Sequence, residues 1–76
     1  MAMKRSIVCG SVTNAIKAKN VLESQGIKVY VERLPRASEI FGCGYCVTVP
    51  SGALNLALEI LNSRGIKYKG VLDAQD

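Results

Sequence analysis

The sequence predicts an α+β fold with its elements in the order β-α-β-β-α-β. Four short runs are rich in β-branched or alternating apolar residues, and two segments between them carry apolar residues at helical spacing. The runs cover residues 5–9, 27–33, 45–49 and 66–72. Residues 21–28 also resemble residues 60–67, so the chain consists of two similar halves. This pattern is typical of the ferredoxin-like arrangement, a four-stranded antiparallel sheet in the order 4-1-3-2 with both helices on one face.

The first half begins with a strand over Arg5–Cys9. The hydroxyl of Ser11 suits the N-cap of the helix that follows, and Gly26 suits a left-handed residue at its end. In Ile27–Arg33, apolar and polar residues alternate, which predicts a second strand with one buried side.

The second half begins after a connection of about eleven residues, Leu34–Gly44, which we interpret as a loop. Connections of this length in compact domains are usually functional or mobile. A third strand then runs from Tyr45 to Val49 and is stopped by Pro50, Ser51 caps the second helix, and Gly65 ends it. Ile66–Leu72 is the expected fourth strand.

The length of 76 residues predicts a single domain, 1–76, with a core over about 5–72 and a flexible tail over 73–76. No apolar run is long enough to span a membrane, and no signal peptide is recognisable, so a cytoplasmic location is expected. The net charge of +4 favours an acidic partner or a nucleic acid only weakly, because it is spread along the chain, and no RNA-binding signature is present. These features argue against membrane and nucleic-acid partners.

Two of the three cysteines, Cys43 and Cys46, lie close together where the long loop becomes the third strand, and Cys43 has a glycine on each side. The glycines would leave the Cys43 sulfur open to solvent and to partners. In the predicted topology the end of the first strand lies beside the start of the third. Cys9 is therefore expected near Cys43 and Cys46, although Cys9 is equally well explained as a small packed residue.

The same edge of the sheet should carry the N-terminus of the first helix, at Gly10 and Ser11. Unpaired backbone N–H groups at a helix N-terminus stabilise a thiolate or a small anion, and a guanidinium such as that of Arg36 adds to the effect. With Gly44 beside the sulfur, these four residues are the candidate thiolate-stabilising group. An ordinary solvated loop charge is the alternative for Arg36.

The spacing of Cys43 and Cys46 is that of a CxxC motif. In extended chain their α-carbons would lie about 10 Å apart, beyond the limit of about 7 Å for a disulfide, so such a bond requires a turn at Gly44. Zinc would need a fourth ligand, a carboxylate such as that of Glu39 or a residue of a second subunit, because the chain has three thiols and no histidine. We therefore expect no metal and no bound cofactor.

Several features together resemble the small bacterial selenium/sulfur carrier-like domains. They are Ser11, Gly26-Ile27, Pro35-Arg36, Cys43-Gly44, Gly65-Ile66 and Tyr68. The resemblance covers residues 6–71 and implies a ferredoxin-like domain in which Cys43 carries sulfur or selenium as a persulfide or perselenide. The chain departs from the family pattern at Phe41-Gly42, and Cys9 is not part of that pattern.

We therefore predict a thiol carrier rather than a complete enzyme, because no residue offers a general base. Cys43 would carry the atom, Cys46 or Cys9 would resolve the loaded state to a disulfide, and proteins that transfer sulfur or selenium would be its partners. The alternative is a ligand-binding or interaction module, or a homodimer, that uses the open sheet face. Tyr30, Cys46, Thr48 and Lys28 would line that face.

Overall fold

The computed structural model describes residues 4–42 and 44–73 of the 76-residue chain. Within these ranges the chain forms four strands, three α-helices and one 3-10 turn. In order they are β1 (Lys4–Cys9), α1 (Val12–Ser24), β2 (Tyr30–Arg33), α2 (Pro35–Phe41), β3 (Tyr45–Pro50), η1 (Ser51–Ala53), α3 (Leu54–Ser63) and β4 (Tyr68–Asp73). None of these helices is long and apolar enough to cross a membrane, as far as the described ranges extend.

The strands form one sheet in the order β2-β3-β1-β4, and every neighbouring pair is antiparallel. Read from the β4 edge, this order is 4-1-3-2. The α+β class and the four-stranded antiparallel sheet are thus confirmed in the described part of the chain. The plain β-α-β-β-α-β succession is wrong, because the helix α2 separates β2 from β3.

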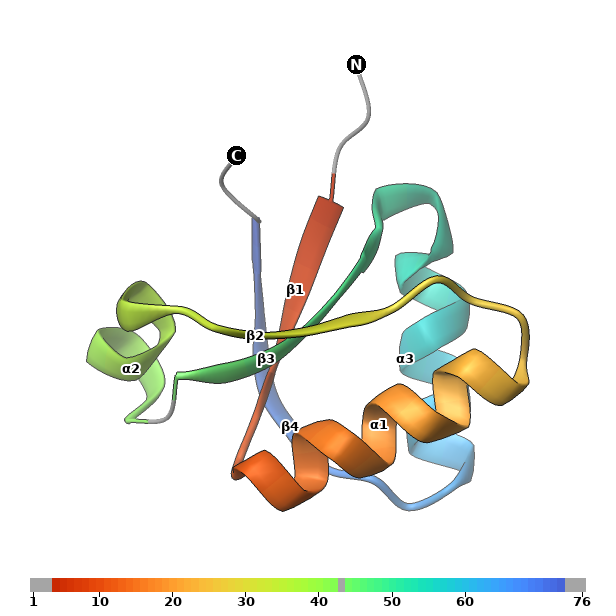
Figure 1. Ribbon diagram of the computed structural model, residues 1–76, viewed down its shortest axis with the longest axis horizontal. Helices are drawn as coiled ribbons and strands as arrows, with labels where there is room; N and C mark the ends of the chain where they lie inside the picture. Colours follow the sequence, from red (N-terminus) through yellow and green to blue (C-terminus); the bar gives the residue numbers. More distant parts are fainter. Residues whose placement is uncertain (1–3, 43, 74–76) are drawn as a thin grey trace.

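The main core lies between the sheet and the two longer helices, α1 and α3 (Figure 1). From the helices, Leu22 and Leu61 are fully buried, and from the central strands Ile7 and Val47 meet them. These side chains recur at helical spacing in the helices and at alternate positions in the strands. The amphipathic pattern of the sequence therefore defines this layer.

The internal repeat of the sequence corresponds to one turn that occurs twice. After α1, the Gly26 N–H donates to Glu23 O and the Ile27 N–H to Leu22 O. After α3, Gly65 and Ile66 donate in the same way to Asn62 O and Leu61 O. Both glycines have positive φ, 83° and 72°. This is the Schellman motif, and it sends each helix back towards the sheet.

The other face of the sheet is covered at one end by α2, so the prediction of an open face is wrong there. Ala37 of α2 is buried with Val8 and Cys46, and the Phe41 ring packs against the same cluster. The ring lies over Gly70 of β4, where an added Cβ would come within 2.6 Å of it. Figure 1 shows α2 beyond the ends of β2 and β3, away from α1 and α3.

Several element boundaries differ from the prediction, and β4, for example, begins at Tyr68 rather than Ile66. The strand β2 begins at Tyr30 rather than Ile27, because the Ile27 N–H is used in the turn after α1. Ser51 does not cap α3: it begins the 3-10 turn η1, and Ala53 occupies the N-cap without a side-chain hydrogen bond. Asp73 is the last residue of β4, while the rest of the predicted tail, 74–76, lies outside the described residues.

Candidate functional site

Position 43, the predicted reactive cysteine, lies outside the described residues, but the backbone on both sides of it is defined. Gly42 ends α2 with φ 77°, a left-handed conformation that favours glycine, and its N–H donates to Ser38 O at 2.9 Å. Gly44 is buried, and a Cβ there would lie 3.0 Å from Leu34 O. The two glycines that flank position 43 in the sequence are thus needed for different reasons.

The carbonyl of Gly44 joins the two ends of the segment that contains α2. It accepts a hydrogen bond from the Leu34 N–H at 2.7 Å, where β2 gives way to α2. It also accepts one from the Cys46 thiol at 3.6 Å. The hydrogen bond between Leu34 and Gly44 therefore holds the two ends of this segment together. The predicted role of Gly44 in stabilising a thiolate is not tested by this geometry.

Cys46 is fully buried at the start of β3. It pairs with Val8 of β1, and its side chain belongs to the cluster beneath α2. The prediction that Cys46 lines an open face is therefore wrong, because α2 covers it. Its thiol could meet another reactant only after local opening of this cluster.

Cys9 is also fully buried, but on the opposite face of the sheet. It belongs to the main core, and its thiol donates to Ile7 O at 3.7 Å. Successive side chains of a strand point to opposite faces, and Val8 is the residue that faces Cys46. The strand ends do lie side by side, as predicted, but the sheet separates the thiols of Cys9 and Cys46.

The N-terminus of α1 is capped as the sequence predicts. Gly10 and Ser11 are exposed, and the Ser11 hydroxyl accepts a hydrogen bond from the Asn14 N–H at 3.1 Å. No acidic residue lies in the first turn, so nothing there offsets the positive end of the helix. Arg36, the second residue of α2, is exposed to solvent. Its expected influence on Cys43 stays a prediction.

The face of the sheet that α2 partly covers also carries a network of hydrogen-bonded polar side chains, which the sequence does not predict. The hydroxyls of Ser6 and Thr48 lie 2.9 Å apart in the buried centre of the sheet, and Thr48 donates in turn to the Glu32 carboxylate. Tyr30 is 47% exposed and lies under the Lys4 ammonium group, 5.2 Å from ring centroid to nitrogen. The alternation of residues in β2 and β3 predicts which side chains share this face. Which of them are neighbours across the two strands depends on the strand register, which the sequence does not give.

No group of three or more His, Cys, Asp or Glu side chains is placed to hold a metal ion in residues 4–42 and 44–73. Lys28, another predicted lining residue, precedes β2 and is exposed outside the sheet. With Thr48 and Cys46 buried, the face predicted for an interaction module is reduced to its edge near Tyr30.

Comparison of the chain with curated proteins and with solved structures gave no significant match to either. A family model described as "Putative Se/S carrier protein-like" matches residues 4–73, which includes every strand and helix described above. Because this match spans far more than half of the chain, the protein belongs to that selenium/sulfur carrier-like family.

Proposed function

We propose that the protein carries sulfur or selenium on Cys43, as a persulfide or perselenide. The observation that supports Cys43 most directly is the burial of the other cysteines. Cys9 and Cys46 are both fully buried, on opposite faces of the sheet. Membership of the carrier-like family supports the type of chemistry.

The transfer needs only thiol chemistry. The Cys43 thiolate attacks the outer sulfur of a donor persulfide, so that a new S–S bond forms at Cys43 and the donor leaves as a thiolate. A nucleophile of the acceptor then attacks the outer sulfur and restores the Cys43 thiolate. No net oxidation occurs in either step. With selenium, the transferred atom is the outer selenium of the donor and the same bonds exchange.

The N-terminus of α1 and Arg36 are the proposed sources of positive potential for the thiolate. Resolution of the loaded state by Cys46 is a separate part of the proposal. In that step the Cys46 thiolate attacks the inner sulfur of Cys43, and hydrosulfide leaves. Because Cys46 lies beneath α2, resolution would be slower than transfer to an acceptor at the surface.

The test is persulfide loading from a low-molecular-weight persulfide donor, followed by intact-protein mass spectrometry of four proteins. We expect the wild type, Cys9→Ser and Cys46→Ser to gain the mass of one sulfur atom, and Cys43→Ser to gain none. Circular dichroism spectra would establish that each variant is folded. Undiminished loading of Cys43→Ser would contradict the proposal, as would loss of loading only in a folded Cys46→Ser protein.

A further inference from the structure

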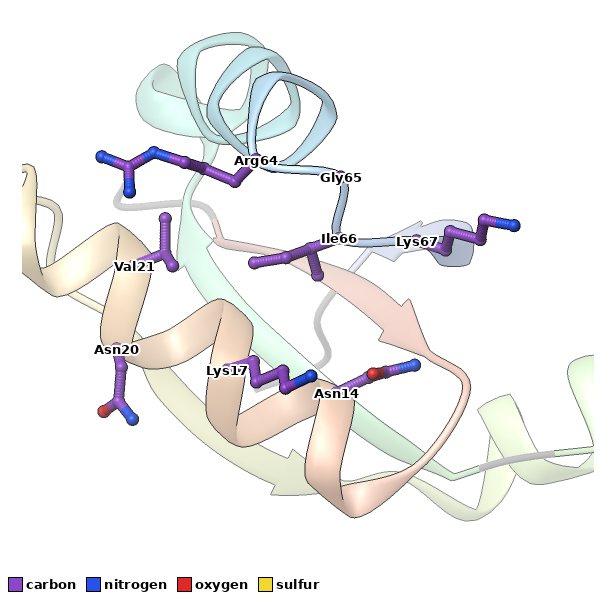
Figure 2. A pocket seen from close by; sticks show the side chains of 8 residues that line it. All are labelled: Asn14, Lys17, Asn20, Val21, Arg64, Gly65, Ile66 and Lys67. Carbon is purple, nitrogen blue, oxygen red and sulfur yellow. The ribbon is translucent and has the colours of Figure 1, made fainter.

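A groove lies between α1 and the turn that joins α3 to β4 (Figure 2). Its volume is about 550 Å³. The residues that line it are Asn14, Lys17, Asn20, Val21, Arg64, Gly65, Ile66 and Lys67. Asn14, Lys17 and Val21 are three or four residues apart, so they form one face of α1. The second wall is the Schellman turn after α3.

The charged residues of the groove all have the same sign. Lys17, Arg64 and Lys67 are cationic, and the other lining residues are neutral. None of these three cations forms a salt bridge with any residue in the described ranges. Unneutralised cations along one surface raise the local concentration of anionic partners.

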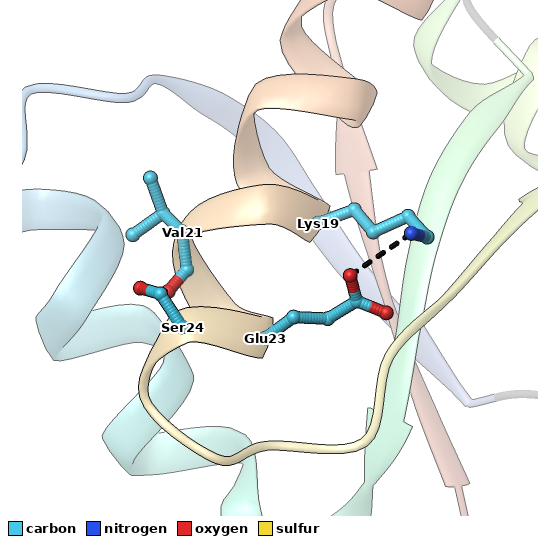
Figure 3. Close-up of polar contacts among 4 residues, drawn as sticks. All are labelled: Lys19, Val21, Glu23 and Ser24. Atoms are coloured by element: carbon cyan, nitrogen blue, oxygen red, sulfur yellow. Dashed lines mark hydrogen bonds and ion pairs between the residues drawn. The ribbon is translucent and has the colours of Figure 1, made fainter.

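Lys19 shows what a neutralised lysine of the same helix looks like. Its ammonium nitrogen lies 3.0 Å from the Glu23 carboxylate, one helical turn further along α1 (Figure 3). Lys17, two residues earlier, has no acidic residue at the equivalent position, because residue 21 is valine. Lys17, the lysine of α1 without an acidic neighbour, is therefore the one that lines the groove.

The cationic surface continues beyond the groove. A second cavity, of about 540 Å³, and a third, of about 260 Å³, share Lys67 with the first. The third also includes Lys69 and Gly10, and therefore reaches the positive N-terminus of α1. Together these cavities form a cationic track from Asn20 to Lys69.

The shape of the groove indicates an extended ligand rather than a compact one. In Figure 2 the Arg64 and Lys67 side chains point to opposite ends, so a single small anion cannot contact both. Val21 and Ile66 lie between them and give the groove an aliphatic part. No aromatic side chain lines the groove itself, whereas proteins that bind single-stranded nucleic acids stack bases on aromatic rings.

We propose that this groove binds an acidic segment of a partner protein. Carboxylates of the segment pair with Lys17, Arg64 and Lys67, and an aliphatic residue between them packs on Val21 and Ile66. The interaction does not require that Cys43 carries sulfur. Among the described residues, no cysteine lines any of the three cavities.

The binding can be measured by fluorescence anisotropy with a short labelled peptide in which leucines interrupt a run of glutamates. The wild-type protein should bind it at low ionic strength, and binding should weaken as salt is added. Charge reversal in Lys17→Glu or Lys67→Glu should weaken binding by at least about fivefold. Lys28→Glu is the matched control, because Lys28 is exposed and lines none of the three cavities.

Three results would overturn the inference. The first is no binding of the peptide at low salt. The second is an equal loss in Lys28→Glu, which would assign the effect to net charge alone. The third is tighter binding of a single-stranded oligonucleotide, which would make the track a nucleic-acid surface. Persulfide loading of Lys17→Glu should equal that of the wild type, so failure here and failure of the carrier function can be told apart.

Discussion

The two faces of the sheet are built differently. One face is covered by α1 and α3, helices of 13 and 10 residues, and holds the main core. The other is covered by α2, a helix of seven residues that buries a much smaller cluster around Cys46. Helices this short are not stable on their own, so α2 depends on its contacts with the sheet. One face therefore stabilises the domain, and the other holds α2 against the sheet.

The largest effect is expected on the α1/α3 face. Leu22→Ala removes a fully buried side chain from the main core and should lower the free energy of unfolding by about 3 kcal/mol. Denaturant titration would measure the change. Ile16→Ala is the control on the same helix, because Ile16 is 49% exposed, and its effect should be much smaller. Equal effects of the two variants would contradict the assignment of the core to this face.

A smaller effect is expected where α2 meets the sheet. In Gly70→Ala the new Cβ would lie within 2.6 Å of the Phe41 ring, so the ring must move, at a cost of about 1–3 kcal/mol. Gly52→Ala is the matched control, since nothing lies within 4 Å of a Cβ at that position.

The contact between Gly70 and Phe41 can be tested with a double-mutant cycle in the same titrations. Once Phe41→Ala has removed the ring, Gly70→Ala should cost little more, so the two effects should not be additive. Simple additivity would show that the ring does not occupy the space above Gly70.

The smallest effect is expected at the N-terminus of α1. Ser11→Ala removes the hydroxyl that accepts from the Asn14 N–H and should cost about 1 kcal/mol. Ser51→Ala is a control of the same chemistry, because no side-chain hydrogen bond caps η1 or α3, and it should change stability by less than about 0.5 kcal/mol. A larger loss of stability in Ser51→Ala would show that Ser51 caps the second helix, as the sequence predicts. Thermal unfolding would rank the two variants.

The α1/α3 face could be predicted from the sequence because its signals are periodic and repeated. Leu22-Glu23 and Leu61-Asn62 recur before the same glycine turn, so both helices and their ends were recognisable. The helix α2 was interpreted as a loop because Pro35 and Gly42 are usually helix breakers. Here Pro35 stands in the first turn and Gly42 ends the helix, where each residue is favoured.

The candidate site was less predictable, because strand adjacency does not determine which face a side chain occupies. A shift of one residue in the pairing of β1 with β3 would have placed Cys9 opposite Cys46. The observed register places Val8 there. The groove was missed for a related reason: Lys17 and Lys67 are distant in the sequence, and only the packing of α1 beside α3 joins them.

The hydrogen bond between the Leu34 N–H and Gly44 O also has a consequence for the design of variants. Leu34 directly follows β2 and Gly44 directly precedes β3, so the connection between the two strands begins and ends at the same point of the sheet. Loop-closure entropy changes slowly with length, so the length of this segment is not what limits its redesign. Ala37 and Phe41 do limit it, because both pack against the sheet, whereas Arg36 and Glu39 are exposed and can be replaced without disturbing that packing.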